Sequence, residues 1–255
     1  MNHYLKNMNE LSVTIITLNE EKDLPRALDS VKGFTDEIVV VDSGSTDNTI
    51  EIAKQFGARV FHREFDNYGN QKNFATSKAA GEWIISLDAD ETITPELANE
   101  IKKAVKSDQF DAYSIPRKNI ILGKFIRYTR WQPELDRHIW LWRRSKGRWE
   151  GDIHEEVVVN GKVGRLKSFK IHHQYENVAE FLEMMNRYSE LDAKEKIAKG
   201  IGFNFFRLLI DPLYNFLVRY VWRLGILDGW RGFVLSYLMA MYHFVVWVKI
   251  WERQK

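Results

Sequence analysis

Residues 83–91 read WIISLDADE, and this segment carries the main signals for both fold and site. Its apolar half, Trp83 to Leu87, predicts a strand that is buried on both faces, as the strands of parallel sheets are. The strand stops at Asp88 and Asp90, two carboxylates that only the small Ala89 separates. Such a pair can hold a hard divalent cation while leaving coordination positions open for phosphate oxygens. The segment therefore predicts a buried sheet with a polar site at the carboxyl end of one strand.

The chain before this segment alternates apolar runs with helical patterns. We expect strands at 12–17, 37–41 and 59–61, and helices at 23–31, 47–56 and 70–80. Asp47 is expected to cap the second of these helices, because Asp side chains accept hydrogen bonds from the first turn. A further helix should open at Thr94-Pro95, since proline fits the first helical position. This alternation predicts an α/β fold with a parallel-type sheet between helices.

Polar clusters follow three of the predicted strands, at 17–20, 42–44 and 88–90, and a fourth lies at 154–156. In open α/β sheets, ligands bind beyond the carboxyl ends of the strands, so the first three clusters are expected to meet at one crevice. The alternative is that each cluster is an ordinary solvated turn, in which Asp is common. Repetition of the arrangement at three strand ends favours the site.

Residues 112–173 consist of short β-like pieces that are rich in aromatic and basic residues, and we interpret them as an elaboration of the sheet. Several tryptophans in this region could stack on sugar faces, although buried aromatic side chains usually serve the core. These tryptophans are Trp131, Trp140, Trp142 and Trp149. Both interpretations stay open from the sequence alone.

A capping-box pattern at Asn177 and Glu180 predicts the start of a helix that should run to about Lys199. One face of this helix is expected to be buried, because apolar residues recur on it at helical spacing. These apolar residues are Val178, Phe181, Leu182 and Met185. We divide the chain into a domain at 1–175 and a helical carboxy-terminal extension at 176–255.

The last 55 residues, 201–255, are rich in aromatic residues and carry seven Lys or Arg against three Asp or Glu. Their uncharged run at 232–248 is short for a bilayer span, which needs roughly 17–25 residues. A basic and aromatic composition favours helices that lie in a membrane interface. The alternative is a helical subdomain that packs on the rest of the protein or on a second subunit.

The overall composition excludes several classes of protein. Hydrophobic residues make up 45% of the 255 residues, which is enough for a core and excludes a disordered chain. With 37 Lys and Arg against 35 Asp and Glu, the charge is too balanced for a protein devoted to nucleic acid. The chain has no cysteine, so disulfides, thiolate metal sites and cysteine nucleophiles are excluded.

Three segments in this order, VTIITLNEE, EIVVVDSGSTDNT and WIISLDADE, resemble the inverting family 2 glycosyltransferases, which have the GT-A fold. Within that family the chain is most similar to enzymes that add a β-1,4-glucose to a heptose of the lipopolysaccharide inner core. The narrower resemblance rests on GNQKNFA, DAYSIPRKN, IHEEV, IHHQY and LDGWRGFVLSY. The resemblance implies a Rossmann-like, nucleotide-binding mixed sheet between helices.

The resemblance also implies roles for individual residues. It assigns donor-nucleotide binding to Thr17, Asn19, Glu20, Asp42, Gln71, Lys72, Asn73, Asp88 and Arg137. It assigns a bound Mg²⁺ or Mn²⁺ to Asp90, Asp88 and His172. Lys72 stands where relatives often have Arg, which preserves the charge but loses the planar fork for bidentate contacts.

The resemblance assigns the catalytic base to Glu155. An inverting transfer needs a carboxylate that deprotonates the acceptor hydroxyl as it attacks the anomeric carbon. Glu156 and Asp152 are the rival carboxylates. Alternation along a strand would direct Glu155 and Glu156 to opposite faces.

The implied activity is metal-dependent transfer of a hexose, with glucose from UDP-glucose favoured, to a lipopolysaccharide-core heptose or a similar lipid-linked glycan. The implied location is cytoplasmic, on the inner face of the cytoplasmic membrane, with a homo-oligomer left open. One alternative keeps the fold with another sugar-nucleotide donor and another surface-polysaccharide acceptor. Others are a non-catalytic sugar-nucleotide-binding module and a nucleotidylyltransferase, although no glycine-rich phosphate loop follows the first strand.

Overall fold

The computed structural model describes residues 10–151 and 155–255. The chain divides into two compact units. The first unit contains the chain up to residue 117 together with residues 136–172, and the second contains residues 118–135 and 173–255. Each unit has a core of its own and is described by itself below.

The first unit contains most of the strands of the chain. The strands of the chain are β1 (Leu11–Thr17), β2 (Glu37–Asp42), β3 (Arg59–His62), β4 (Trp83–Ser86), β5 (Glu91–Ile93), β6 (Ala112–Ile121), β7 (Lys124–Phe125), β8 (Arg137–Arg143), β9 (Gly147–Glu150), β10 (Glu156–Val159), β11 (Val163–Arg165) and β12 (Lys170–His173). The helices of the first unit are α1 (Leu24–Val31), α2 (Thr49–Gln55), α3 (Tyr68–Lys78) and α4 (Pro95–Ala104).

The main sheet is mixed, with strand order β3-β2-β1-β4-β8-β6-β12-β5. The predicted parallel arrangement is confirmed for its first four strands, because β1 pairs in parallel with β2 and β4, and β2 with β3. Beyond β4 the pairing becomes antiparallel, between β4 and β8 and between β8 and β6. The strand β12 pairs antiparallel with β5, while β9 and β10 form a separate two-stranded sheet.

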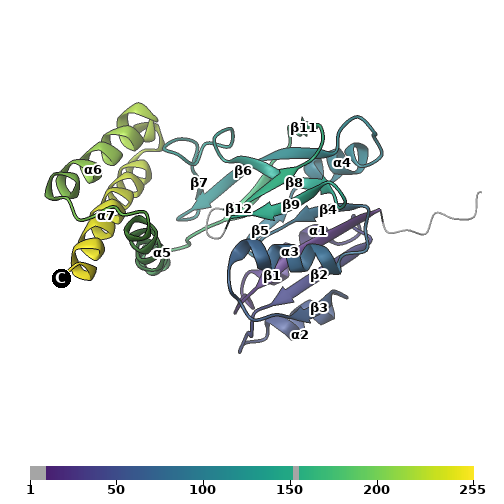
Figure 1. The fold of residues 1–255 in the computed structure, drawn as a ribbon. Helices are drawn as coiled ribbons and strands as arrows, with labels where there is room; N and C mark the ends of the chain where they lie inside the picture. Colours follow the sequence, from purple (N-terminus) through teal and green to yellow (C-terminus); the bar gives the residue numbers. More distant parts are fainter. Residues whose placement is uncertain (1–9, 152–154) are drawn as a thin grey trace, which may run out of the picture. The chain divides into compact units, whose positions relative to one another are not determined.

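Helices cover both faces of the parallel part of the sheet (Figure 1). Parallel crossovers are right-handed, and the chain moves from β1 through β2 to β3 before it returns to β4. This path puts α1 and α2, which contact each other, on one face and α3 on the opposite face. The carboxyl ends of β1, β2 and β4 consequently lie at one edge of the sheet, as the three polar clusters require.

The core of the first unit forms from the apolar runs that predicted its strands. Val39, Val40 and Val41 of β2 are fully buried, as are Ile84 and Ile85 of β4. β-branched side chains suit a strand that is covered on both faces. The predicted strands and helices before residue 105 are all present, with small shifts at their ends.

One predicted helix cap is wrong in position. Asn48, and not Asp47, is the capping residue of α2, and its side chain makes no capping hydrogen bond. Asp47 still serves the first turn, because its Oδ1 accepts hydrogen bonds from the Thr49 N–H at 3.1 Å and the Thr49 hydroxyl at 2.6 Å. The helix opening at Thr94 is confirmed, since its side chain accepts from the N–H of Leu97.

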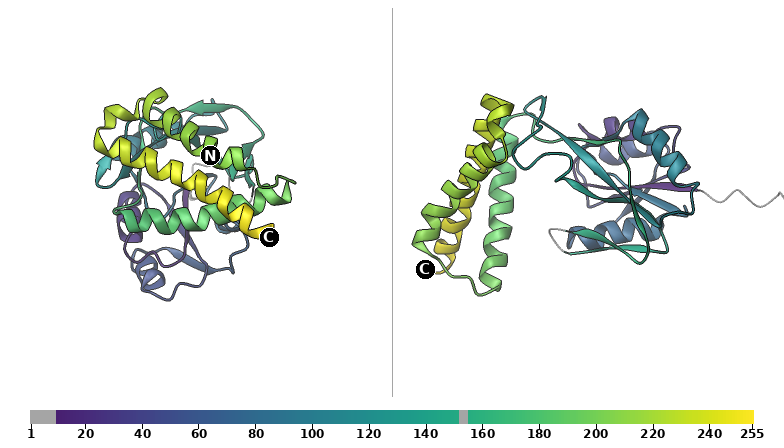
Figure 2. Two further views of the ribbon diagram at one scale, coloured as in Figure 1. Left: turned by 90° about the vertical axis from the view of Figure 1, so that its left-hand side faces the viewer. Right: turned by 90° about the horizontal axis from the view of Figure 1, so that it is seen from above.

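The second unit is helical. It contains α5 (Val178–Ala198), α6 (Phe205–Leu217) and α7 (Trp230–Arg253), with a π-helical turn η1 (Val218–Trp222) and a 3₁₀ turn η2 (Gly225–Asp228) between the last two. The helix α7 packs against both α5 and α6 (Figure 2). The predicted helix start at Asn177 is confirmed, because its Oδ1 accepts the Glu180 N–H at 3.0 Å. The Glu180 carboxylate accepts the N–H of Glu176 at 2.7 Å, one residue before the N–H that a capping box would use.

The apolar face predicted for α5 is correct only in part. Phe181 and Met185 are buried, whereas Val178 and Leu182 are exposed. The buried residues of the helix are Phe181, Met185, Ser189 and Ala193, which repeat every four residues. A narrow stripe of this kind is enough to pack against one neighbouring helix, so the flanking apolar positions stay at the surface.

The helix α6 buries none of its residues, although its sequence is FFRLLIDPLYNFL. Of the helices in the described residues, α7 is long and apolar enough to cross a membrane, with 39% of its most apolar stretch buried. The core helix of a soluble protein passes the same test, so this observation is weak evidence for a membrane span.

Candidate active site

Lys72 is the central cation of the candidate site. It lies on α3, is 5% exposed, and its Nζ contacts Glu155 Oε1 at 2.8 Å and Asp88 Oδ1 at 3.1 Å. The ring of Trp149 lies 4.6 Å from the same nitrogen, where a cation–π attraction adds to the ion pairs. Burial alone would lower the pKa of Lys72, but Asp88 and Glu155 outweigh it and raise the pKa. The side chain is therefore a fixed positive charge between two carboxylates.

The two carboxylates after β4 have different partners. Asp88 pairs with Lys72, and although burial opposes it, the positive charges of Lys72, Lys170 and Arg117 lower its pKa. Asp90 is directed elsewhere, because its Oδ2 lies 2.9 Å from Nε2 of His172 on β12. The side chain of Asp90 remains 35% exposed, so one of its faces is open.

A layer of buried ion pairs lies next to Asp88. Glu91 is fully buried, and its carboxylate contacts Lys170 Nζ at 2.5 Å, Arg117 Nη1 at 3.1 Å and the N–H of Asp88 at 2.8 Å. Arg117 also grips Asp136 with two parallel hydrogen bonds of 2.9 and 3.0 Å, a bidentate geometry. Through the hydrogen bond from the N–H of Asp88 to Glu91, this network fixes the backbone at Asp88.

Burial and partners shift the two cations of this layer in opposite directions. Burial lowers the pKa of Lys170, and Glu91 offsets that effect only in part. The pKa of Arg117 is raised, because Glu91 and Asp136 outweigh its burial. The ring of Trp140 lies 3.3 Å from the Lys170 Nζ, which makes this tryptophan a support for the charged layer.

The loops after β1 and β2 are joined by the residues that the resemblance assigned to the nucleotide. The buried Asp42 accepts hydrogen bonds from the Thr17 hydroxyl at 3.0 Å, the Ser45 hydroxyl at 2.5 Å, and the N–H groups of Gly44 and Ser45. Burial raises the pKa of Asp42, but these hydrogen bonds prevail and lower it. Asp42 thus stabilises the turn that follows β2.

Asn19 adopts a left-handed conformation with φ of 56° and links the same two loops. Its N–H donates to the Ser45 hydroxyl at 2.8 Å, and its Oδ1 accepts from the Thr46 N–H at 2.8 Å. Asn tolerates this conformation better than most residues do. The connection holds the carboxyl ends of β1 and β2 together at the edge of the sheet.

Glu20 follows directly and faces other acids. Burial is the largest reason that its pKa is raised to about 8, and the negative charges of Asp90, Asp23, Asp88 and Asp47 add to the effect. A carboxylate with so many acidic neighbours is poised to accept a cation or a proton.

Two predicted residues of α3 position the helix. The Gln71 side chain donates to the Ser43 hydroxyl at 2.9 Å, so it ties α3 to the turn after β2. Asn73 makes two hydrogen bonds of 2.9 Å with the backbone N–H and carbonyl of Trp149 on β9. The helix that carries Lys72 is therefore fixed on both sides.

The remaining predicted residues lie as follows. Arg137 donates from Nη1 to the backbone carbonyls of Ser114 and Leu166, at 3.0 and 2.9 Å. The side chain of Glu155 is 14% exposed and that of Glu156 is 74% exposed, so the two adjacent carboxylates occupy different environments. Asp152 and His154 lie outside the described residues.

The sequence did not single out Lys170, Glu91 or Arg117 as parts of the site. Lys170 stands two residues before His172 on β12, so strand alternation places both on the same face. The position of Lys170 could therefore have been predicted from that of His172. Of the tryptophans, Trp140 and Trp149 are buried beside the charged groups and Trp142 is fully buried, as expected for core residues.

The residues present fit a divalent cation with two protein ligands. Asp90 and His172 approach within 2.9 Å across two elements. The carboxylate of Asp90 suits Mg²⁺ or Mn²⁺, and the imidazole of His172 fits the transition metal Mn²⁺ better than it fits Mg²⁺. Within residues 10–151 and 155–255, no group of three His, Asp or Glu side chains forms a ready-made metal site. Further ligands would come from a bound phosphate, which is the usual arrangement for Mg²⁺.

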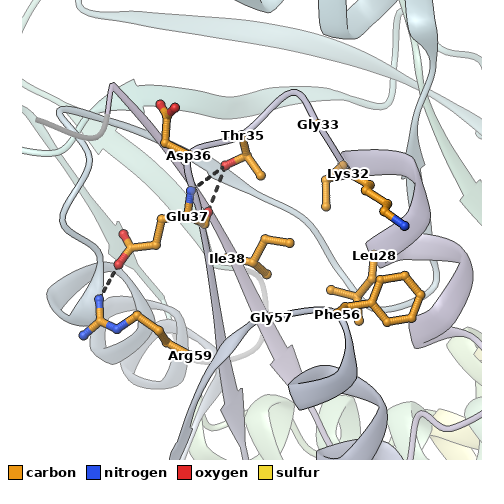
Figure 3. Close-up of a pocket in the computed structure, with 11 residues that line it drawn as sticks. Leu28, Lys32, Gly33, Thr35, Asp36, Glu37, Ile38, Phe56, Gly57 and Arg59 are labelled. Atoms are coloured by element: carbon orange, nitrogen blue, oxygen red, sulfur yellow. Dashed lines mark hydrogen bonds and ion pairs between the residues drawn. The ribbon is translucent and has the colours of Figure 1, made fainter. Parts of the chain in front are cut away.

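A pocket of about 350 Å³ lies away from these groups (Figure 3). It is lined by residues of α1, of the start of β2 and of the end of α2, including Leu28, Glu37 and Phe56. Glu37 is the first residue of β2, whereas Asp42 is the last, so this pocket belongs to the opposite edge of the sheet.

The chain is similar to known proteins along most of its length. Residues 12–174 match the family described as Glycosyl transferase family 2. An uncharacterized glycosyltransferase of Rickettsia typhi is 33% identical over 258 residues, which cover 96% of this chain and 88% of the relative. The lipopolysaccharide core biosynthesis glycosyltransferase LpsC of Rhizobium meliloti is 30% identical over 256 residues, with 95% of this chain and 92% of LpsC covered.

Among solved structures, TarS of S. aureus matches with a TM-score of 0.49 and 19% identity. The match covers 71% of this chain and 39% of TarS. The family match over most of the chain and the relatives that align along nearly all of it confirm the expected family and the expected mixed sheet between helices. The chain belongs to glycosyl transferase family 2, and it is a glycosyltransferase with the GT-A fold.

Proposed function

We propose that this glycosyltransferase is metal-dependent and inverting, and that it transfers a hexose from a UDP-sugar to a lipid-linked glycan. The favoured donor is UDP-glucose, and the favoured acceptor is a heptose of a lipopolysaccharide inner core. One observation carries the proposal: Lys72 holds Glu155 and Asp88 within 3.1 Å of a single nitrogen. A carboxylate suited to proton removal is thereby held beside the acidic pair that is suited to the donor.

Glu155 is the proposed general base. Its carboxylate is oriented by the ion pair with Lys72, and a positioned carboxylate can take the proton of an attacking hydroxyl. Glu156 is the weaker candidate, because its side chain is 74% exposed and lies 3.9 Å from His138. Its carboxylate lacks the buried setting that fixes a catalytic group.

Asp90 and His172 would hold Mg²⁺ or Mn²⁺, and the ion would neutralise charge on the departing diphosphate. Lys72 and the charged layer of Lys170, Glu91 and Arg117 would keep Asp88 ionised and fixed for a donor hydroxyl. The hydrogen bonds of Asn19 and Asp42 would hold the two loops in the shape that receives the nucleotide.

The similarity to LpsC supports the acceptor, because the name of that relative assigns it to lipopolysaccharide core biosynthesis. An acceptor that is anchored in a membrane requires the enzyme to work at the membrane surface. The exposed apolar side chains of α6 support contact between the carboxy-terminal extension and that surface.

The test is nucleotide release by the purified protein from a panel of UDP-, GDP- and dTDP-sugars. Each donor is supplied with Mg²⁺, with Mn²⁺ or with a chelator, and then with a heptose-containing core acceptor. The proposal predicts metal-dependent UDP release from UDP-glucose that rises on addition of the acceptor. Release from another donor would overturn the glucose assignment. Equal release with a metal ion and with a chelator would overturn the proposed metal dependence.

A further inference from the structure

Arg219 is a buried cation that forms no ion pair with the residues that the structure describes. It lies in the π-helical turn η1 of the second unit and is 7% exposed. Its Nε and Nη1 are enclosed, and in the part of the chain that the structure describes they have no hydrogen-bond partner. The ring of Trp131 lies 5.0 Å from the guanidinium carbon, which covers a face of the group and leaves its N–H edges free.

A second and a third arginine lie close to it. Burial and the positive charge of Arg130 lower the pKa of Arg219 to about 10. Arg223, one turn further along, also has a buried Nε without a partner among residues 10–151 and 155–255. The acid of the turn η2, Asp228, accepts the backbone N–H groups of Arg127 and Tyr128 at 3.1 and 2.9 Å.

The backbone around these arginines is tightly built. The N–H of Thr129 donates to the carbonyl of Arg223 at 3.0 Å, and Thr129 has a φ of 66°. The N–H of Arg223 donates five residues back to Val218 at 2.7 Å, the hydrogen bond of a π-turn. A methyl group on Gly225 would lie 2.9 Å from the Thr129 side chain, so the contact requires glycine. These contacts hold the backbone that carries Arg219 and Arg223 in a fixed conformation.

Apolar side chains surround the arginines along the chain. Between residues 221 and 230 the exposed large hydrophobic residues are Val221, Trp222, Leu224, Ile226, Leu227 and Trp230. Trp222 is 80% exposed, an unusual position in water but a common one at the level of lipid headgroups. The arginines and these apolar side chains together match a bilayer surface, where phosphates lie above hydrocarbon.

We propose that Arg219, together with Arg130 and Arg223, binds the phosphate of an anionic lipid headgroup while residues 221–230 enter the membrane interface. A guanidinium fits a phosphate with two parallel hydrogen bonds, and the anion supplies the charge that Arg219 lacks. The proposal does not depend on the sugar that the enzyme transfers.

The test is co-sedimentation of the full chain with vesicles of phosphatidylcholine, with or without phosphatidylglycerol. We expect sedimentation only with the phosphatidylglycerol vesicles, and a decrease as salt screens the charges. Equal sedimentation with both kinds of vesicle would overturn the phosphate site, and so would no sedimentation at low salt. Transfer activity is not the readout, so failure here would leave the glycosyl-transfer proposal intact.

Two matched pairs of variants test the named arginines. Arg207 is exposed in the same unit on α6 and serves as the control position. Arg219→Lys keeps the charge but loses the fork, and should weaken vesicle binding about fivefold, whereas Arg207→Lys should leave it unchanged. Arg130→Gln removes a charge from an exposed position and should weaken binding about fivefold, against less than twofold for Arg207→Gln. Equal vesicle binding by the two members of each pair would overturn the site. If Arg219→Lys does not fold, the comparison of Arg130→Gln with Arg207→Gln decides.

A further experiment distinguishes a lipid phosphate from soluble phosphate as the ligand of the site. Inorganic phosphate is titrated into the wild-type chain and into Arg130→Gln without vesicles. We expect at most millimolar affinity, because the apolar contribution is absent. Tight phosphate binding that Arg130→Gln abolishes, together with no preference for phosphatidylglycerol, would assign the site to a soluble anion and overturn the lipid.

Discussion

Lys72 is the residue on which the candidate site depends most. Its substitution by Met would leave Asp88 and Glu155 close together without the cation that joins them. Removing one partner of a buried ion pair costs about 3–5 kcal/mol, so the free energy of unfolding should fall by about 3 kcal/mol. Urea unfolding measures the change. Lys78→Met, at the end of the same helix, is the control, and a loss no larger than that of the control would contradict the central role.

Glu20 makes stability depend on pH in the metal-free protein. Its pKa is raised from 4.5 to about 8 in the folded state by burial and by its acidic neighbours, so between these values the folded state binds more protons than the unfolded state. Stability is then highest below pH 4.5 for this group and is lost as the pH rises toward 8. Glu20→Gln should make the protein more stable at pH 8 by about 1–2 kcal/mol, a figure that allows for solvent screening.

Urea unfolding at pH 5 and at pH 8 with a chelator present checks this expectation. The variant should show a smaller decrease between the two pH values than the wild type does. An equal decrease in both proteins would show that Glu20 titrates normally.

Asp90 is expected to be the main protein ligand of the cation. Asp90→Ala should abolish the stimulation of UDP release by Mn²⁺, because His172 alone offers one ligand. Titration of Mn²⁺ in the presence of UDP measures the lost affinity, which should be at least tenfold. Glu51→Ala, an exposed acid on α2, is the control. Unchanged Mn²⁺ affinity in Asp90→Ala would move the cation away from this carboxylate.

Some residues of the site could be predicted from the sequence, and others could not. Asp88 and Asp90 were predictable because an apolar strand leads directly to them, and His172 and Glu155 because family segments contain them. Lys170, Glu91 and Arg117 were missed, since their ion pairs join strands that are far apart in the sequence. Local patterns record burial but do not record which strands become neighbours.

At the scale of elements, the connection between α3 and β9 positions the site. Asn73 forms both of its 2.9 Å hydrogen bonds with the backbone of Trp149, whose ring also contacts Lys72. Asn73→Ala should lower the transfer rate about tenfold or more, because a small displacement of catalytic groups has a large effect on rate. Asn70→Ala on the same helix should leave the rate within twofold. Initial rates of acceptor-dependent UDP release check this, and equal rates in the two variants would contradict the positioning role.

The same scale shows where sequence patterns stop being informative. The strands β1, β2 and β4 were predictable because β-branched runs mark strands that are buried on both faces. The antiparallel strands β6 and β8, which complete the sheet, carry no pattern that names their partner. The helix α5 shows a similar limit, because Val178 and Leu182 fit the apolar period yet lie outside its narrow contact with α7.

At the scale of the whole molecule, a nearly neutral chain divides its surface into regions of different chemistry. The first unit brings Glu20, Asp88 and Asp90 together at one edge of the sheet, while the second unit carries exposed apolar side chains and arginines. The composition alone predicted neither distribution, because a net charge of +2 is compatible with any arrangement. The basic and aromatic character of residues 201–255 did indicate the apolar and basic surface of the second unit. The helix α6, which buries none of its residues, forms part of that surface.

The measurement that tests the central claim most directly is acceptor-dependent UDP release from UDP-glucose by Glu155→Gln. Glu156→Gln is the matched control, since the two carboxylates are adjacent and only Glu155 is paired with Lys72. We predict that Glu155→Gln binds UDP as the wild type does but loses transfer by about 10²–10⁴-fold, while Glu156→Gln stays within threefold of the wild type. A wild-type rate in Glu155→Gln would contradict the account and leave the ion pair with Lys72 as a structural contact.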